Sequence, residues 1–399
     1  MTVSAFDVCG PLPDGTTVLE ASAGTGKTFT VAALAARYVA EGRVGLQDLL
    51  LVTFGRAATA ELRQRVRDRL VSAERDLADP AAARGSRDTV LALLADATPD
   101  EVAVRRRRLA TAVADFDAAT IATTHQFCHQ ILAGLGIAAD TDPDALFVDD
   151  LEDLIVEVVE DLYVRKYGTA DAPVPHFTRE VALTIARQAV TDGQARLEPA
   201  DSAPGDVSHV RYRFAAAVRA EVHRRKRERH LYCFDDMLTG LNAALTHPVR
   251  GPAACQRLRE RYAVVLVDEF QDTDPVQWSI VRTAFHGHTT LVLIGDPKQA
   301  IYAFRGADVI SYLSASGDGP AHATLGTNWR SDRGVLSAFE TVFGGAALGD
   351  SRITVRPVAA AHLDARLPGP PFRIRVLSRD GFPLNKSGLV PITDARAAV

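Results

Sequence analysis

The segment from Val264 to Thr273 most constrains how this chain can fold. It reads Val-Val-Leu-Val-Asp-Glu-Phe-Gln-Asp-Thr, so an apolar, β-branched run ends in two adjacent carboxylates. Such a run predicts a buried parallel strand that delivers Asp268 and Glu269 to the strand's carboxyl end, where ligands bind in open α/β sheets. Asp268 could bind Mg²⁺, and Glu269 could orient or deprotonate a water molecule. A solvated acidic turn after an ordinary strand is the alternative.

A second segment, near the N-terminus, has the features of a phosphate-binding loop. Residues 16–20 predict a short strand, residues 21–28 read Ala-Ser-Ala-Gly-Thr-Gly-Lys-Thr, and residues 29–41 predict a helix. Small residues let backbone N–H groups turn toward a phosphate, and the helix N-terminus adds a favourable dipole. We expect Lys27 to reach the β- and γ-phosphates of a nucleotide, and the Thr28 hydroxyl to bind Mg²⁺. The predicted phosphate loop comprises Ala21, Ser22, Ala23, Gly24, Thr25, Gly26, Lys27 and Thr28.

One position of this loop departs from the usual pattern, because Ala21 stands where glycine is typical. A flexible Gly/Ser/Thr turn before an ordinary helix is therefore the alternative interpretation. The acidic strand end at Asp268 favours the phosphate loop, since two parts of a Mg-nucleotide site then occur in one chain.

Composition restricts the class of protein. A length of 399 residues predicts two or three domains, at roughly 100–200 residues each. No apolar run reaches the roughly 18 residues that cross a bilayer, and residues 1–10 lack the basic start and apolar core of a signal peptide. The four cysteines are scattered, which fits a reducing compartment. We therefore expect a cytoplasmic protein with no membrane partner, and its net charge of −5 leaves room for a local nucleic-acid groove only.

Lysine is rare in this chain. Lysine and arginine total 45, but five of these are lysine: Lys27, Lys166, Lys226, Lys298 and Lys386. A lysine retained in such a chain suggests that its position requires a compact point charge. Lys27 and Lys298 lie in motifs, whereas the other three have no evident role in the sequence.

Four further segments lead from apolar strands into polar residues. Residues 49–54 read Leu-Leu-Leu-Val-Thr-Phe before a predicted helix over 56–70, and residues 121–132 read Ile-Ala-Thr-Thr-His-Gln-Phe-Cys-His-Gln-Ile-Leu. Residues 294–306 include Gly-Asp-Pro-Lys-Gln-Ala-Ile-Tyr and then Phe-Arg-Gly, and residues 325–332 read Leu-Gly-Thr-Asn-Trp-Arg-Ser-Asp. Helices alternating with strands predict an α/β fold with a doubly wound parallel sheet. The predicted strands lie near 16–20, 49–53, 121–123, 264–268 and 291–294.

In this order the motifs resemble those of superfamily 1A DNA helicases of the UvrD/Rep type, which are P-loop NTPases with a RecA-like fold. The sequences of residues 20–29 and 295–308 resemble RecB in detail, as does Phe-Asp-Asp-Met-Leu at 234–238. The resemblance covers about residues 5–335 and implies ATP and Mg²⁺ as cofactors.

The resemblance also implies roles for individual residues. Asp268 would coordinate Mg²⁺, and Glu269 would be the general base for the attacking water. Gln299 resembles the family's γ-phosphate sensor, Arg330 an arginine that contacts the γ-phosphate, and Trp329 an aromatic that stacks on adenine. The matching DNA-track positions are Thr53, Phe54, His125, Tyr302, Phe304 and Arg305.

Three features depart from the family's pattern. No glutamine occurs between Met1 and Gly26, where the family often has one that reads adenine, so that role is left unassigned. Gly55 replaces a more usual threonine, and Gln126 stands where glycine or serine is common.

The resemblance implies a UvrD-like ATP-binding domain over residues 1–333. Its core, 1A, would comprise residues 1–135 and 232–324. Residues 136–231, with their helices of charged faces, would form an inserted helical subdomain, 1B. Residues 325–399 would be the truncated start of a second RecA-like domain, 2A.

The C-terminal residues predict short elements separated by a loop. Residues 352–356 and 371–377 could be strands, and residues 368–371 predict a loop. Residues 393–399 resemble a helix cap followed by one turn. We therefore expect a fragment, with the family's motifs V and VI and any nuclease domain beyond residue 399.

The implied function is that of an ATP-dependent 3′–5′ DNA helicase and translocase of recombinational double-strand-break repair. Implied partners are single-stranded or duplex-end DNA and, in the full-length protein, RecC- and RecD-like subunits. A fragment of a stand-alone UvrD/AddA-type helicase, or a non-catalytic nucleotide-binding scaffold, is the alternative.

Three clusters have competing interpretations. His125, Cys128 and His129 share a helix face and could ligate zinc, but no fourth ligand is near in sequence. The arginines at 105–108 and the basic run at 223–230 could contact DNA, although solvated helix faces are the favoured interpretation.

Overall fold

The computed structural model forms two compact units, residues 1–325 and 326–399, and each is described by itself. Described residues are 4–135, 145–171, 174–191, 193, 195–301, 308–317, 321–366, 368–373, 382–383 and 385–391.

Within the described residues of the first unit, seven parallel strands form one sheet in the order β1-β9-β2-β8-β7-β3-β4. This confirms the predicted α/β fold with a parallel sheet. The strands are β1 (Ser4–Ala5), β2 (Thr16–Glu20), β3 (Leu49–Thr53), β4 (Thr120–Thr123), β7 (Val264–Val267), β8 (Thr290–Gly295) and β9 (Ala321–Thr324).

The sequence did not predict β1 and β9, which lie at one edge of the sheet. Both lack an apolar, β-branched run: β1 reads Ser-Ala and β9 reads Ala-His-Ala-Thr. These segments have little strand propensity of their own, and pairing with the sheet stabilises their extended conformation. β9 pairs with β2, and β1 pairs with β9.

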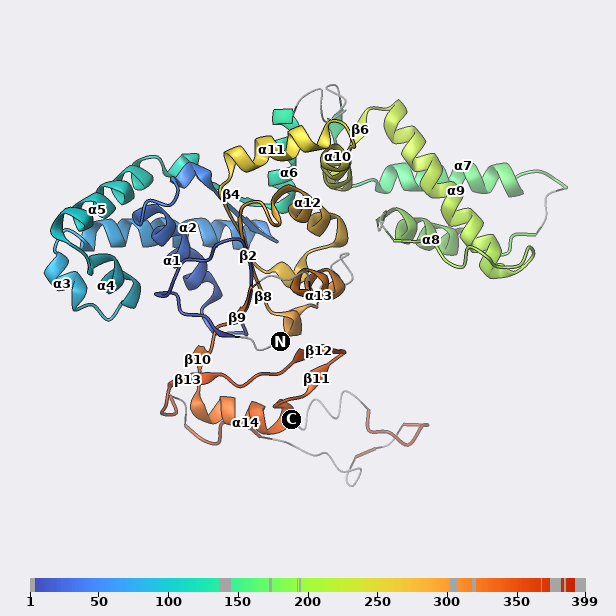
Figure 1. Cartoon of the computed structure of the whole chain (residues 1–399). Helices are drawn as coiled ribbons and strands as arrows, with labels where there is room; N and C mark the ends of the chain where they lie inside the picture. The colour runs from blue at the N-terminus through green and yellow to red at the C-terminus, as the bar shows by residue number, and fades with distance from the viewer. Residues whose placement is uncertain are drawn as a thin grey trace. The chain divides into compact units, whose positions relative to one another are not determined.

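Helices cover both faces of this sheet (Figure 1). On one face, Leu49 and Leu51 join Leu34 and Val66 in an apolar cluster, and because side chains alternate along a strand, the buried Leu50 points to the other face. The helices of the first face are α1 (Lys27–Ala40), α2 (Arg56–Asp76), α3 (Pro80–Arg84), α4 (Thr89–Ala95) and α5 (Pro99–Ala114). Those of the second group are α6 (Thr124–Leu135), α10 (Phe234–Thr246), α11 (Gly251–Arg261), α12 (Pro275–Phe285) and α13 (Val309–Gly317).

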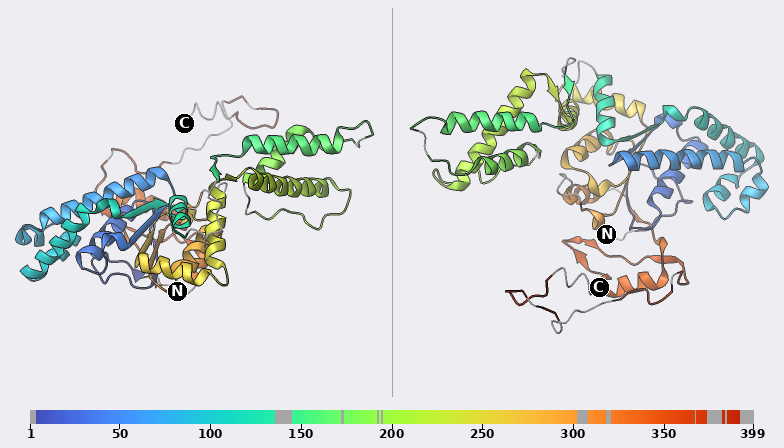
Figure 2. Two further views of the ribbon diagram at one scale, coloured as in Figure 1. Left: turned by 90° about the horizontal axis from the view of Figure 1, so that it is seen from above. Right: turned by 180° about the vertical axis from the view of Figure 1, so that it is seen from behind.

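Three helices between residues 145 and 232 pack on one another (Figure 2). Leu154, Val158, Ala186 and Val218 form part of their shared apolar cluster, so these amphipathic helices bury their apolar faces together. The helices are α7 (Glu152–Tyr167), α8 (Arg179–Thr191) and α9 (Val207–Glu228), flanked by the paired strands β5 (Leu146–Phe147) and β6 (Leu231–Tyr232).

The described residues of the second unit form two small sheets and one helix. The strands β10 (Thr327–Asp332) and β13 (Ala359–His362) are parallel, and β11 (Ala347–Leu348) and β12 (Asp350–Thr354) are antiparallel. The helix is α14 (Arg333–Phe343).

One of the strands predicted near the C-terminus is found in this unit. The strand expected at 352–356 overlaps β12, whereas residues 371–373 are not in a strand. Residues 374–377 and 393–399 lie outside the described residues. No helix in the described part of the chain is long and apolar enough to cross a bilayer.

Candidate active site

The carboxyl ends of three adjacent strands build the site. β8 lies between β2 and β7, so the loops that follow these strands meet at one edge of the sheet. The phosphate loop follows β2, the acidic segment follows β7, and a short 3₁₀ turn, η5 (Pro297–Gln299), follows β8.

The phosphate loop has the backbone of an anion cradle. Gly24 and Gly26 have φ angles of 80° and 89°, in the left-handed region that favours glycine. The Thr25 hydroxyl donates a hydrogen bond to the Ser22 carbonyl at 2.7 Å, which fixes the turn. No side chain caps α1 at Gly26, so the first N–H groups of this helix are available to a phosphate.

Ala21 has a local explanation. Its side chain is buried in the apolar cluster with α1, and its N–H donates to the Gly295 carbonyl at 2.9 Å. The methyl group therefore fills core space at the start of the loop and faces no phosphate.

Lys27 and Glu269 connect the phosphate loop to the acidic segment. The distance between Lys27 Nζ and Glu269 Oε2 is 2.7 Å, and Gln271 Nε2 donates to the same oxygen at 2.8 Å. Glu269 has φ 52° and ψ 41°, a left-handed conformation that costs a non-glycine residue of order 1–3 kcal/mol. The sheet edge thus holds this carboxylate in a strained but well-bonded position.

Asp268 and Asp272 flank Glu269 and lie in a poorly solvated environment. Burial, with a smaller contribution from the Glu269 charge, raises the pKa of Asp268 to about 6 and that of Asp272 to about 6. Asp272 Oδ1 is buried and has no hydrogen-bond partner among the described residues. Carboxylates in this condition fit a divalent cation, because the cation restores the charged form that burial disfavours.

A polar chain continues from Gln271 to the turn after β8. Gln271 Oε1 accepts the Asp296 N–H at 2.9 Å, and Gln299 Nε2 donates to Asp296 Oδ2 at 2.8 Å. Lys298 Nζ lies 2.7 Å from both Asp296 Oδ1 and Glu20 Oε1. The three strand ends are therefore joined by side-chain contacts as well as by the sheet.

A second feature of this unit is an aromatic groove with a volume of about 1060 Å³. In it, the His125 ring lies 5.3 Å from that of Phe234, and the Phe147 ring lies 4.9 Å from Phe234, both edge to face. Burial lowers the pKa of His125, so its imidazole is neutral at neutral pH. The lining also includes Phe54, Arg56, Gln126, His129 and Tyr232.

Comparison with known proteins decides the family. Residues 6–320 match the UvrD/REP helicase N-terminal domain. The chain belongs to the UvrD/REP helicase family. The predicted resemblance to UvrD/Rep-type helicases is thereby confirmed.

Several relatives of this UvrD/REP helicase chain carry the name RecBCD enzyme subunit RecB. That of Mycolicibacterium smegmatis is 49% identical over 383 residues, which cover 94% of this chain and 34% of the relative. That of Mycobacterium tuberculosis is 47% identical over 397 residues, covering 98% and 36%. That of Escherichia coli is 47% identical over 133 residues, covering 33% and 11%. The chain spans about a third of the length of the first two relatives.

The predicted site residues of this UvrD/REP helicase chain lie in more than one place. Those of the phosphate loop, with Asp268, Glu269 and Gln299, meet at the sheet edge, and Phe54 and His125 line the aromatic groove. Thr53 is buried at the end of β3, and its hydroxyl has no partner among the described residues.

The remaining predicted residues are not among the described residues of the first unit. Tyr302, Phe304 and Arg305 lie outside the described residues. Trp329 and Arg330 belong to β10 of the second unit, and both are exposed there.

The zinc interpretation finds no support in the described part of this helicase chain, where no group of three or more potential ligands could hold a metal ion. Cys128 is fully buried, and burial raises the pKa of its thiol to about 12, which disfavours the thiolate that zinc binds.

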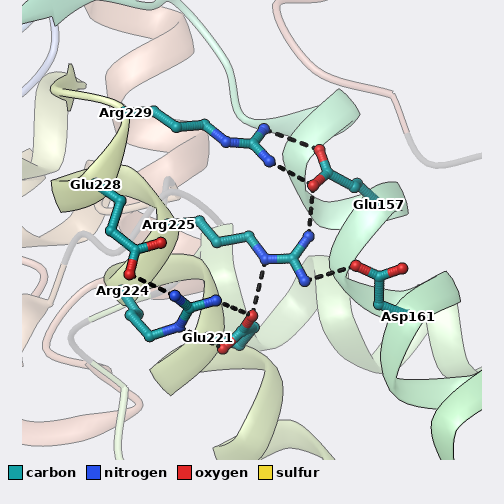
Figure 3. A network of polar contacts seen from close by, with 7 residues as sticks. All are labelled: Glu157, Asp161, Glu221, Arg224, Arg225, Glu228 and Arg229. Atoms are coloured by element: carbon teal, nitrogen blue, oxygen red, sulfur yellow. Dashed lines mark hydrogen bonds and ion pairs between the residues drawn. The ribbon is translucent and has the colours of Figure 1, made fainter.

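The expectation of solvated basic faces was wrong for several side chains. Figure 3 shows Arg225 of α9 pointing toward α7, where it bonds to Glu157 and Asp161 at 2.5 and 2.6 Å. Arg225 also bonds to Glu221 at 2.8 Å and is buried. In the other basic cluster, Arg108 donates to the Ala40 carbonyl at 3.1 Å. These arginines join helices, which a linear run of charges does not reveal.

The sequence did not predict the contacts of three polar side chains, those of Gln271, Lys298 and Lys226. Gln271 was recognised as part of the acidic segment but was given no role. Lys298 was noted for its rarity, but its contacts with Glu20 and Asp296 were not foreseen. Lys226, considered to lack a role, donates to Asp236 and to Cys233 Sγ, at 2.8 and 3.2 Å. The scarcity of lysine was the one available signal.

Proposed function

We propose that this chain is the N-terminal ATP-binding portion of a RecB-like, ATP-dependent 3′–5′ DNA helicase of recombinational double-strand-break repair. The observation that carries the proposal is the 2.7 Å contact between Lys27 and Glu269. It joins a phosphate cradle to a carboxylate suited to activate water. The family match and the names of the relatives support the same activity.

In this proposal the nucleotide is ATP and the metal is Mg²⁺. Thr28 and Asp268 would hold the ion, which supplies positive charge against the phosphates when bound. Lys27 would contact the terminal phosphates, and Glu269 would orient the attacking water and accept its proton. Gln299 would sense the γ-phosphate, and Arg330 and Trp329 would act from the second unit on phosphate and adenine.

The aromatic groove is the proposed path of single-stranded DNA. His125 and Phe54 line it, and aromatic stacking contributes roughly 1–3 kcal/mol per base without sequence preference. A neutral His125 can stack or donate a hydrogen bond without adding charge. Thr53, Tyr302, Phe304 and Arg305 complete the proposed track.

Domain roles and partners follow from the same proposal. Residues 136–231 would be the helical 1B insertion in a 1A core of residues 1–135 and 232–324, and residues 325–399 would begin domain 2A. Relatives named as subunits of RecBCD suggest RecC- and RecD-like partners for the full-length protein. A cytoplasmic location is included, because the DNA substrate lies there.

Nucleotide binding by the 399-residue chain tests the ATP site. We expect Mg·ADP to bind weakly in a fluorescence titration, and Lys27→Ala to weaken binding by about tenfold or more, the loss of one charge-assisted phosphate contact. Lys166→Ala is the matched control, because Lys166 lies on α7 over the Tyr167 ring, away from the site. Equal affinity of the Lys27 variant and the wild type would refute the proposed site.

Turnover separates the helicase from the scaffold alternative. In the full-length protein that this proposal implies, Glu269→Gln should reduce DNA-stimulated ATP hydrolysis by about 10²–10⁴-fold, the usual contribution of a general base. An unaffected rate supports the non-catalytic scaffold. In this proposal the 399-residue chain alone shows little turnover, because it spans about a third of its first two relatives and an arginine worth about 10³–10⁵ in rate would come from the rest of the protein.

A further inference from the structure

We infer that Gln271 is a positioning residue that ties the Glu269 carboxylate to the turn after β8, so that movement at Gln299 is transmitted to Glu269. This inference rests on the proposed nucleotide site and concerns a residue behind it. Gln271 would not touch the nucleotide; it would act through Glu269.

Burial and bonding make Gln271 a rigid connector. Its side chain is 2% exposed and uses both ends: Nε2 donates to Glu269 Oε2 at 2.8 Å and to Asp272 Oδ2 at 3.2 Å, and Oε1 accepts the Asp296 N–H at 2.9 Å. A buried amide satisfied at both ends has one low-energy orientation, because any rotation leaves a polar group unpaired.

The neighbouring strand is shaped to receive this side chain. A Cβ atom on Gly295 would lie 2.7 Å from Gln271 Oε1 and 3.1 Å from its backbone nitrogen. Glycine at the end of β8 therefore permits the close approach by which Gln271 reaches the Asp296 N–H.

Lys27 and Gln271 both donate to Oε2 of Glu269. A bound nucleotide would affect these two contacts differently. Lys27 is the ligand for phosphate, so nucleotide binding draws it away from Glu269. Gln271 has no phosphate to bind and remains on Glu269 Oε2. Since Asp296 also accepts a hydrogen bond from Gln299, the carboxylate is then positioned from the β8 side.

Amide hydrogen exchange at Asp296–Gln299, with and without the non-hydrolysable analogue Mg·AMP-PNP, tests this connection in the 399-residue chain. In the wild type, we expect the analogue to change exchange at Asp296. In Gln271→Met, which keeps the volume but loses both hydrogen bonds, Asp296 should exchange roughly tenfold faster without ligand, the loss of one hydrogen bond. The response to the analogue should be lost, while its Kd stays within about threefold.

A second variant separates the two ends of Gln271. In Gln271→Glu the Asp296 N–H keeps an acceptor, but the neutral amide donor to Glu269 is replaced by a second carboxyl group that competes with Glu269 for a proton. We expect Asp296 to stay protected and the response to the analogue to disappear. Gln277→Met is the matched control, since Gln277 is also buried but lies on α12, and it should behave as the wild type.

The outcomes are distinguishable. If the wild-type chain binds no Mg·AMP-PNP, the proposed function fails, and this inference fails with it. If the analogue binds and both Gln271 variants keep the wild-type response, the nucleotide site stands and the connection through Gln271 is overturned. Loss of the response in the Gln277 control as well would also overturn it, because the effect would then be general.

Discussion

Lys27 and Glu269 are 242 residues apart in sequence and form an ion pair, with 2.7 Å between Nζ and Oε2. Lys27 is the proposed phosphate ligand, and Glu269 is the proposed general base. While the ion pair is formed, Lys27 does not contact a phosphate and Glu269 has one oxygen occupied. A nucleotide must therefore replace one contact with another when it binds. This exchange makes the affinity for nucleotide depend on the charge at position 269.

Removing that charge should strengthen nucleotide binding. Glu269→Gln frees Lys27 from a partly exposed ion pair, and such pairs contribute at most about 1 kcal/mol, so affinity for Mg·ADP should rise about three- to fivefold. Isothermal titration calorimetry with ADP measures this without hydrolysis. Glu260→Gln, on the exposed face of α11, serves as control; unchanged or weaker binding by the Glu269 variant would contradict the exchange.

Asp268→Asn should stabilise the metal-free chain near neutral pH. Burial raises the pKa of Asp268 from 3.8 to about 6, so the folded state binds the proton more tightly than the unfolded state. Its contribution to stability therefore falls as pH rises from about 4 to 6, by up to about 3 kcal/mol. Thermal unfolding should show the variant with a higher Tm at pH 7.5 and a similar Tm at pH 4.

The same substitution should remove the Mg²⁺ dependence of nucleotide affinity, which links the instability to function. Asp149→Asn, at an exposed position, is the control and should change neither property. A lower Tm for Asp268→Asn at pH 7.5 would show that the carboxylate stabilises the fold, contrary to this prediction.

The arginine network between α7 and α9 should make these helices sensitive to acid. Hydrogen bonds from Arg224 and Arg225 lower the pKa of Glu221 to about 2, so its stabilising contribution is complete above its ordinary pKa and is lost as pH falls toward 2. Glu221→Gln should thus destabilise the chain at pH 7 and progressively less below pH 4 in urea unfolding. Glu180→Gln, exposed on α8, should have little effect at either pH.

Lys226 should contribute to stability through Asp236. Its ammonium group lies 2.7 Å from Asp236 Oδ2, and that oxygen also accepts the Cys233 N–H at the start of α10. Lys226→Met leaves a partly buried carboxylate without its cation and should cost about 1–3 kcal/mol of unfolding free energy. A double-mutant cycle with Asp236→Asn measures the coupling, and Lys166→Met is the control. Additive effects of the two substitutions would exclude a direct interaction.

The elements with strong local patterns were predicted closely. β2 and β3 have the expected bounds, β7 differs from its predicted range by one residue at one end, and β8 differs by one residue at each end. The bounds were predictable because the apolar residues of each strand end at a polar residue or a glycine. β9 was missed because its Ala-His-Ala-Thr sequence has no such pattern. Helix α2 continues to Asp76, beyond the expected Leu70, since its later residues still bury Ala73.

The candidate site was predicted in part. The phosphate loop and acidic segment were recognised as motifs, and the structure brings them together; their chemical roles stay predictions. The contacts of Gln271, Lys226 and Arg225 could not be predicted, because each depends on which distant segment packs against it. A buried glutamine and an exposed one have the same local signature.

The sequence by itself determined the parts that depend on neighbours in the chain: the strand–loop–helix of the phosphate loop, the apolar strand ending in Asp268 and Glu269, and the family. The tertiary structure alone decided which side chains meet. β8 is inserted between β2 and β7, out of sequence order, and this arrangement pairs Lys27 with Glu269 and places Gln271 against Asp296. The physical reason is that burial and hydrogen bonding of these polar groups depend on packing at the sheet edge. There, residues distant in the sequence shield one another from water.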